Sequence, residues 1–187
     1  GTMSLIDVHD LESNSLLTAD ICIVGSDAAG ITLATALDGS SHTVCLIESG
    51  SYSPDGETQS LYDLEIAGYP VRENSMSRAR YFGGSCNVWA GRSMKLTELD
   101  VKPREWIPQS GWPIVYAELA RYYGLAENIL RLPSIERFEK ITLCRQMSQQ
   151  EKALFDNDDL QPNIAMWAKK PLRFGAAYRS RLKGIRD

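Results

Sequence analysis

The sequence has little histidine, no clustered cysteine and no excess of positive charge. Its 20 Lys and Arg against 24 Asp and Glu give a formal charge of -4, which is too slight to indicate a nucleic-acid or strongly acidic partner. The four cysteines stand far apart without a CxxC pair, so their spacing offers no zinc knuckle and no dithiol redox motif. We therefore expect free thiols, buried or partly buried, at Cys22, Cys45, Cys86 and Cys144.

The sequence also lacks an uninterrupted apolar run of membrane-spanning length. Its longest apolar stretch, from Ile21 to Leu37, is broken by Gly25, Asp27 and Gly30. A strand and a helix joined by a turn therefore explain this stretch better than a membrane helix does. The N-terminus has none of the features of a signal peptide, so we expect a cytoplasmic protein with no membrane or nucleic-acid partner.

A strand, a helix and a second strand are predicted near the N-terminus. Residues 1–18 read as a polar N-terminal extension with at most a short strand in LIDVHD. The β-branched run Ile21 to Val24 is typical of a strand buried on both faces of a parallel sheet. Ala29 to Leu37 has helical composition, and Thr43 to Glu48 resembles a second buried strand. Together they predict a βαβ unit in a domain that covers residues 19–187.

The rest of the chain carries weaker signals. Tyr81 to Arg92 is a second glycine-rich segment, and its aromatic content favours a loop packed against another part of the protein. Apolar residues at helical spacing predict an amphipathic helix from Val115 to Leu130 that ends before Pro133. Further elements are expected as a helix over Cys144–Phe155, a strand over Asn163–Trp167 and a basic helix over Gly175–Lys183.

The first turn has the layout of a dinucleotide-binding turn. In such turns one glycine makes the bend, a second lets the main chain approach the pyrophosphate, and a third lets helix and strand pack closely. Those places are held here by Gly25, Asp27 and Gly30, and a helix starting near Ala28 would direct its free N–H groups at the phosphates. Glu48, at the end of the second strand, is placed to accept from ribose hydroxyls. The alternative is a βαβ packing turn without a ligand.

Four blocks in order give a more specific indication. ADICIVGSDAAGITLATAL, VCLIESG, RARYFGGSCNVWAGR and SGWPIVYAELARYYGLAENIL resemble the N-terminal part of a bacterial GMC-type (glucose-methanol-choline) flavin oxidoreductase. The resemblance covers nearly the whole chain but only about the first third of a typical member. It implies an α/β fold with a Rossmann-like FAD-binding βαβ core, an incomplete sheet, added helices and the start of the substrate domain.

The resemblance also implies a set of FAD-binding residues. Residues 25–30 would hold the pyrophosphate, Glu48 the adenosine ribose, and residues 83–88 the pyrophosphate and the face of the flavin ring. The family oxidises alcohols, often sugars or other polyols, by hydride transfer to the flavin. The expected cofactor site comprises Gly25, Ser26, Asp27, Ala28, Gly30, Glu48, Ser49, Gly83, Gly84, Ser85, Asn87 and Val88.

Two departures from the family pattern concern the cofactor. Val88 stands where related members often have a histidine that in some anchors the flavin, so any FAD here would be non-covalent. Asp27 puts a carboxylate at the second glycine position, and at about 4 Å from a phosphate it would cost about 4 kcal/mol at an effective dielectric near 20. Asp27 would then weaken or abolish binding, unless it turns away to cap the helix. It could equally have been introduced to abolish binding.

The third departure concerns catalysis. The family takes the substrate proton with a histidine near its C-terminus, whereas the only histidines here are His9 in the extension and His42 in the turn before the second strand. Without a positioned base the chain has no candidate for general-base catalysis. A two-stranded parallel sheet also leaves apolar surface uncovered, so we expect a partner: a complementary C-terminal polypeptide, a homologous subunit or a second copy.

Three functions remain open at this point. The first is the FAD-binding portion of a GMC-type oxidoreductase that acts on an alcohol with a complementary chain supplying the histidine. The second is a non-catalytic, degenerate flavoprotein subunit that stabilises or regulates an active homologue. The third, an NAD-dependent dehydrogenase, is disfavoured because the Gly83-Gly84-Ser85 block has no part in a simple nicotinamide fold.

Overall fold

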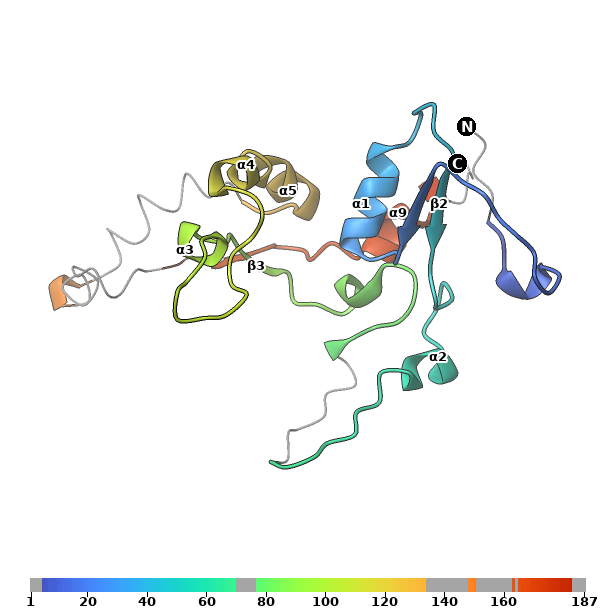
Figure 1. Cartoon of the computed structure of the whole chain (residues 1–187), viewed down its shortest axis with the longest axis horizontal. Helices are drawn as coiled ribbons and strands as arrows, with labels where there is room; N and C mark the ends of the chain where they lie inside the picture. Colours follow the sequence, from blue (N-terminus) through green and yellow to red (C-terminus); the bar gives the residue numbers. More distant parts are fainter. Residues whose placement is uncertain (1–4, 70–76, 134–147, 151–162, 164, 183–187) are drawn as a thin grey trace. The chain divides into compact units, whose positions relative to one another are not determined.

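The structure, a computed structural model, is a mixed α/β protein of short helices and two small sheets (Figure 1). It describes residues 5–69, 77–133, 148–150, 163 and 165–182. The chain divides into two compact units, one formed by residues 1–89 with residues 172–187 and the other by residues 90–171. The first unit contains the predicted βαβ segment and both glycine-rich segments.

The described part of the first unit has a parallel α/β arrangement. Strands β1 and β2 pair in parallel with Ile21 opposite Val44 and Val24 opposite Ile47, so the predicted βαβ unit is confirmed. Helix α1 contacts both strands (Figure 1). In chain order the elements are η1 (Val8–Asp10), β1 (Ile21–Val24), α1 (Ala28–Ala36), β2 (Val44–Ile47), α2 (Gly56–Ser60), η3 (Gly84–Asn87) and α9 (Phe174–Leu182).

Close packing of α1 on β1 depends on Gly30. A Cβ at this position would lie 1.9 Å from the Gly25 carbonyl oxygen and 3.5 Å from the Ile23 side chain. Beside it, Ile31 is fully buried and Ile23 is 7% exposed. Gly30 therefore does what the third glycine of a dinucleotide turn does, which is to bring the helix against the strand.

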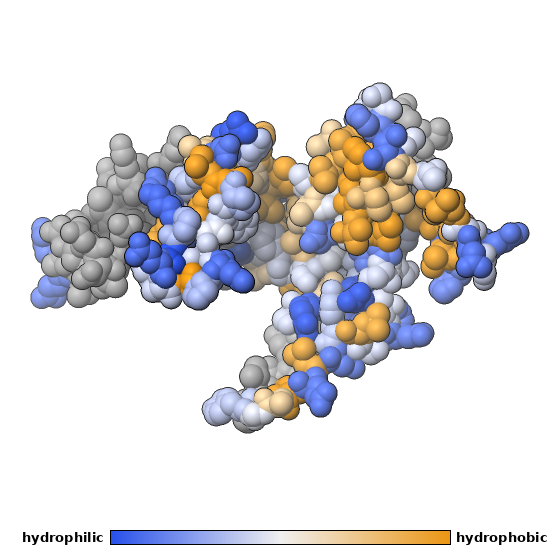
Figure 2. Space-filling model, viewed as in Figure 1, coloured by the Kyte–Doolittle hydropathy of each residue, from blue (hydrophilic) through white to orange (hydrophobic). Residues whose placement is uncertain are grey.

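The expectation that the first strand is buried on both faces is wrong. The exposed fraction of Val24 is 83%, and that of its register partner Ile47 is 49%. Helix α1 is itself apolar around its circumference, with Leu33 exposed, and Figure 2 shows hydrophobic residues gathered over it. In the described part of the chain this sheet has two strands, and the face opposite α1 exposes Cys22, Val24 and Ile47, as the sequence led us to expect for an incomplete sheet.

Helix α9 joins the first unit from far along the chain. It begins one residue before the predicted basic helix, and Phe174 at its start is fully buried. The Gly175 N–H donates to Asn87 Oδ1 at 3.0 Å, and a Cβ on Gly175 would lie 2.4 Å from the Phe82 carbonyl oxygen. The helix therefore holds the second glycine-rich segment by close backbone contact.

The second unit consists of short helices beside a two-stranded antiparallel sheet in which Ser93 pairs with Met166. Its strand β4 confirms the strand expected near Trp167. The predicted single helix over Val115–Leu130 is wrong, since it divides at Tyr122, whose N–H bonds to the Leu119 carbonyl in a tighter turn. The elements are β3 (Arg92–Met94), α3 (Glu98–Val101), α4 (Tyr116–Ala120), α5 (Tyr123–Leu130) and β4 (Ala165–Trp167).

Two further expectations concern the N-terminal extension and the region after residue 133. The LIDVHD segment contains the 3-10 turn η1 instead of a strand, because Asp7 caps it by accepting from the His9 N–H at 3.0 Å. The helix expected over Cys144–Phe155 falls almost entirely outside the described residues. Within the described ranges, no helix has both the length and the apolar character to cross a membrane.

Candidate functional site

The first glycine turn lies at the edge of the sheet where the parallel strands end. The Gly25 N–H donates to the Ile47 carbonyl at 2.8 Å, which continues the β1–β2 ladder into the turn. Gly25 then adopts a φ of +95°, and no atom lies within 4 Å of the place where a Cβ would be. The turn therefore has the left-handed backbone and the open approach that glycine provides at the first position.

The second glycine segment lies directly against the first. The Gly83 N–H donates to the Ser26 carbonyl at 2.8 Å, and a Cβ on Gly84 would be 2.9 Å from the Asp27 Cβ. Both glycines have positive φ, 96° and 55°. The sequence predicted a loop packed against another part of the protein, and that part is the predicted phosphate turn. Two segments almost sixty residues apart in the chain thus form one backbone site.

The Glu48 side chain fixes the first glycine turn by hydrogen bonds. Its Oε2 accepts from the Ser26 N–H at 3.0 Å and from the Ser26 hydroxyl at 2.5 Å, and its Oε1 accepts from the Gly50 N–H at 2.9 Å. Ser26 is fully buried, so its hydroxyl depends on this carboxylate for a partner. The sequence led us to assign Glu48 to a ribose, and we did not predict this bond. The positions of Ser26 and Glu48, shortly after the end of one strand and directly after the end of the other, could have indicated it.

These hydrogen bonds set the charge state of Glu48. Burial raises its pKa, but the bonds from Ser26, Gly50 and Ser49 together outweigh burial and hold the pKa below the usual glutamate value. Because the pKa in the folded protein is lower than in the unfolded chain, the stabilisation is complete at neutral pH. It declines as the pH falls below the ordinary glutamate pKa of about 4.3.

A Glu48→Gln variant tests this account of Glu48. The amide NH2 group would face a backbone N–H, so we expect the free energy of unfolding at pH 7 to fall by about 2 kcal/mol. We also expect the free energy of unfolding to decline less steeply with falling pH in the variant than in the unmodified chain. Urea unfolding at several pH values measures both quantities, and equal acid sensitivity in the two proteins would contradict the role assigned to Glu48.

Asp27 caps helix α1 with its own side chain. Its Oδ1 accepts from the Ala29 N–H and the Gly30 N–H, both at 3.0 Å, and its carbonyl accepts from the Ile31 N–H at 2.9 Å. The capping alternative for Asp27 is therefore confirmed. The cap does not turn the charge away from the turn, however, because the anionic oxygen occupies N–H groups that a bound phosphate would use.

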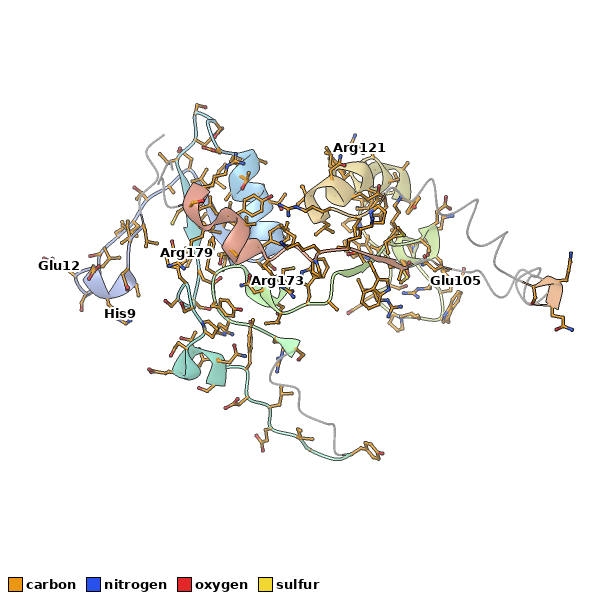
Figure 3. All side chains as sticks on the ribbon, turned by 180° about the vertical axis from the view of Figure 1, so that it is seen from behind. His9, Glu12, Glu105, Arg121, Arg173 and Arg179 are labelled. Atoms are coloured by element: carbon orange, nitrogen blue, oxygen red, sulfur yellow. The ribbon has the colours of Figure 1, made fainter. Side chains whose placement is uncertain are left out.

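Cys86 belongs to the second glycine segment, and the negative charge of Asp27 affects the pKa of its thiol. Burial and the negative charge of Asp27 raise the pKa of its thiol, against smaller lowering effects from the Ala28 N–H and Arg173. The thiol therefore stays protonated at neutral pH. Arg173, labelled in Figure 3, lies directly before α9, and its guanidinium donates to the Trp89 carbonyl.

The polar side chains of the second segment hold the loop itself. The Ser85 hydroxyl accepts from the Ala79 N–H at 3.1 Å. The Asn87 side chain donates to the Phe82 carbonyl at 2.8 Å and accepts from Gly175. Val88 is half-buried and closes η3 through an N–H bond to the Ser85 carbonyl at 3.1 Å. The side chains predicted to face a flavin thus also fix the shape of the segment that would carry it.

A cationic group missed by the sequence analysis lies next to Ser49. The Arg80 Nη1 donates to the Ser49 hydroxyl at 2.9 Å, and its guanidinium lies 4.3 Å from the centre of the Tyr62 ring. The Arg78 guanidinium lies 4.9 Å from the centre of the same ring. The Gln59 side chain donates to the Arg78 carbonyl and accepts from the Arg80 N–H. The RAR run before the second glycine segment was the available signal.

Neither histidine lies in the glycine segments. His9 is on η1, exposed in the N-terminal extension (Figure 3). His42 is exposed beside Asp20 and Thr43, at the edge where both strands begin. Because the strands are parallel, that edge is opposite the one that carries Gly25. Neither histidine of this sequence is therefore placed to act as a general base at the glycine segments.

The backbone of the first turn would admit a dinucleotide phosphate at one place and oppose it at another. The space at Gly25 is open, whereas Asp27 would have to leave the Ala29 and Gly30 N–H groups before a phosphate could use them. Among the described residues, no three His, Cys, Asp or Glu side chains gather in a way that could hold a metal ion. Comparison with family models, curated proteins and solved structures finds no match for this chain.

Proposed function

We propose that this chain forms a Rossmann-like core that holds the ADP half of FAD in a GMC-type oxidoreductase acting on the CH–OH group of an alcohol or sugar-like substrate. The observation that carries the proposal is the contact between the two glycine segments, with Gly83 N–H on the Ser26 carbonyl and Gly84 against Asp27. A βαβ turn that only joins a strand to a helix would not need a second pair of glycines with positive φ packed against it.

The residues take complementary parts in this proposal. The turn from Gly25 to Gly30 and the Gly83-Gly84 backbone hold the pyrophosphate. Glu48 Oε1 accepts from the Gly50 N–H and, at 3.5 Å, from the Ser49 hydroxyl, and a ribose hydroxyl would take the place of the longer of these two bonds. FAD bound there supplies an acceptor for a hydride from the substrate carbon. Val88 offers no nucleophile, so the flavin is held without a covalent bond.

The proton acceptor and the substrate pocket come from outside these residues. His9 and His42 lie away from the glycine segments, and the exposed Val24 and Leu33 leave apolar surface for further protein to cover. We propose that a complementary polypeptide segment or a homologous subunit supplies both. The chain's own task is to position the cofactor.

A second function is favoured by Asp27. Its carboxylate already occupies the Ala29 and Gly30 N–H groups at the start of α1. A chain whose helix N-terminus is satisfied in this way is suited to a non-catalytic role, as a degenerate flavoprotein subunit that stabilises or regulates an active homologue. Bound FAD separates the two functions.

Competition between nucleotides tests the first proposal. FAD is titrated into the chain and followed by its visible absorption difference, and then ADP-ribose or FMN is added. Because the contacts proposed for residues 25–30 and Glu48 are to the ADP half, ADP-ribose should displace FAD at lower concentration than FMN does. Displacement by FMN alone would contradict the assignment of the site. Absence of any FAD binding, at concentrations up to solubility and also in an Asp27→Gly variant, would leave the non-catalytic function.

A further inference from the structure

Two cysteines that are 23 positions apart in the sequence are neighbours in the sheet. Cys22 in β1 and Cys45 in β2 are register partners of the parallel pair. Adjacent strands lie about 4.8 Å apart, and register partners direct their side chains to the same face of the sheet. Both cysteines are free, Cys22 is exposed and Cys45 is half-buried. The fold thus creates a thiol pair that sequence spacing did not reveal.

The face that carries this pair is the open one. Ile23, which alternates with Cys22 along the strand, packs beneath Gly30 of α1. On the other face the next pair along the strands is Val24 and Ile47, 83% and 49% exposed. An ion in solution therefore reaches the two thiols without any movement of α1.

We infer that Cys22 and Cys45 form a two-thiolate site for a soft, thiol-binding cation of the Cu(I) class. Parallel side chains keep the two Cβ atoms near the strand spacing, which exceeds the 3.5–4.5 Å that a disulfide needs. One ion bound to two sulfurs at about 2.3 Å holds those sulfurs about 3.8–4.6 Å apart, between tetrahedral and linear angles. The pair is thus spaced for a bridging ion better than for a direct S–S bond.

The number of ligands selects the class of ion. Among the described residues, no third His, Cys, Asp or Glu gathers with this pair, so a four-coordinate structural zinc site is not formed. Cu(I) is soft, prefers thiolate and is satisfied by two such ligands. Binding converts Cu⁺ and two thiols to a bis-thiolate complex with release of two protons, and no electron is transferred. The two thiols take no part in the proposed cofactor site. They share a sheet face with Val24, so the partner proposed above would cover them, and the ion site belongs to the chain by itself.

Transfer of Cu(I) from its coloured bathocuproine disulfonate complex, without oxygen, tests the inference on the whole chain. The Cys86→Ser/Cys144→Ser variant, which keeps only the strand pair, should take one Cu(I) per chain. Adding Cys22→Ser or Cys45→Ser removes the chelate, and the affinity should fall at least about a hundredfold. Failure of the first variant to hold Cu(I), or unchanged affinity after loss of either strand cysteine, would overturn the inference.

A second probe needs only the variant that keeps the pair. Phenylarsine oxide joins two close thiols through one arsenic atom and releases one water, and the mass of the Cys86→Ser/Cys144→Ser chain should rise by a single adduct. Iodoacetamide added afterwards should modify neither remaining cysteine. Two separate alkylations with no arsenic adduct would show that the thiols are too far apart for any bridging ion.

Discussion

FAD affinity is expected to rise by about a thousandfold when Asp27 is replaced by glycine. The Asp27 carboxylate occupies the Ala29 and Gly30 N–H groups at 3.0 Å and would lie near the incoming phosphates. A unit charge about 4 Å from another costs about 4 kcal/mol at an effective dielectric near 20, which corresponds to this change in dissociation constant. Glycine is tolerated at the cap for a few tenths of a kcal/mol, so the turn keeps its shape.

Asp27→Asn is the matched control for this variant. Asparagine caps a helix as well as aspartate does but carries no charge, and it still covers the two N–H groups. Its FAD affinity should therefore lie between those of the unmodified chain and Asp27→Gly. Isothermal titration measures all three, and equal affinities would show that Asp27 does not oppose the cofactor.

The Gly30→Ala variant should lose about 3 kcal/mol of unfolding free energy. The added Cβ would lie 1.9 Å from the Gly25 carbonyl oxygen, and because that atom is backbone, α1 has to move away from the sheet. Overpacking of this kind costs about 1–3 kcal/mol, and this contact is at the severe end. Urea unfolding followed by far-UV circular dichroism gives the value.

Gly124→Ala provides the comparison within the same protein. Gly124 lies in α5, and no atom is within 4 Å of the place of its Cβ. Alanine there should stabilise the helix by up to about 1 kcal/mol, because it lowers the entropy cost of glycine in a helix. Equal effects at the two positions would show that Gly30 does not mark a close approach of helix and strand.

In the first unit, the sequence predicted correctly the features that depend on residues close together in the chain. The β-branched run predicted β1 at Ile21–Val24, and the alanine- and leucine-rich composition of Ala29–Leu37 predicted α1 to within one residue at each end. The cap by Asp27 was among the alternatives because aspartate accepts from the N–H groups two and three residues ahead, an interaction that is local by nature.

Long-range contacts account for what the sequence could not predict. The Ser26–Glu48 bond, the contact of Gly83 with Ser26 and the pairing of Cys22 with Cys45 each join segments at least 22 positions apart. The exposure of Val24 depends on how many strands and helices share the sheet, which the strand's own residues do not encode. The division of the predicted helix at Tyr122 reflects a local 3-10 turn that apolar spacing cannot distinguish from α-helix.

A titration of the 15N-labelled chain with FAD, followed by amide chemical shifts, tests directly whether the two glycine segments hold the cofactor. We predict that the largest shifts fall on residues 25–30 and 83–88, and that the Ala29 and Gly30 amides shift as Asp27 releases them. We expect strand β4 and helix α5 to be unaffected. Saturating FAD that leaves both glycine segments unchanged, or that shifts a different set of amides, would contradict the assignment of these segments to the cofactor.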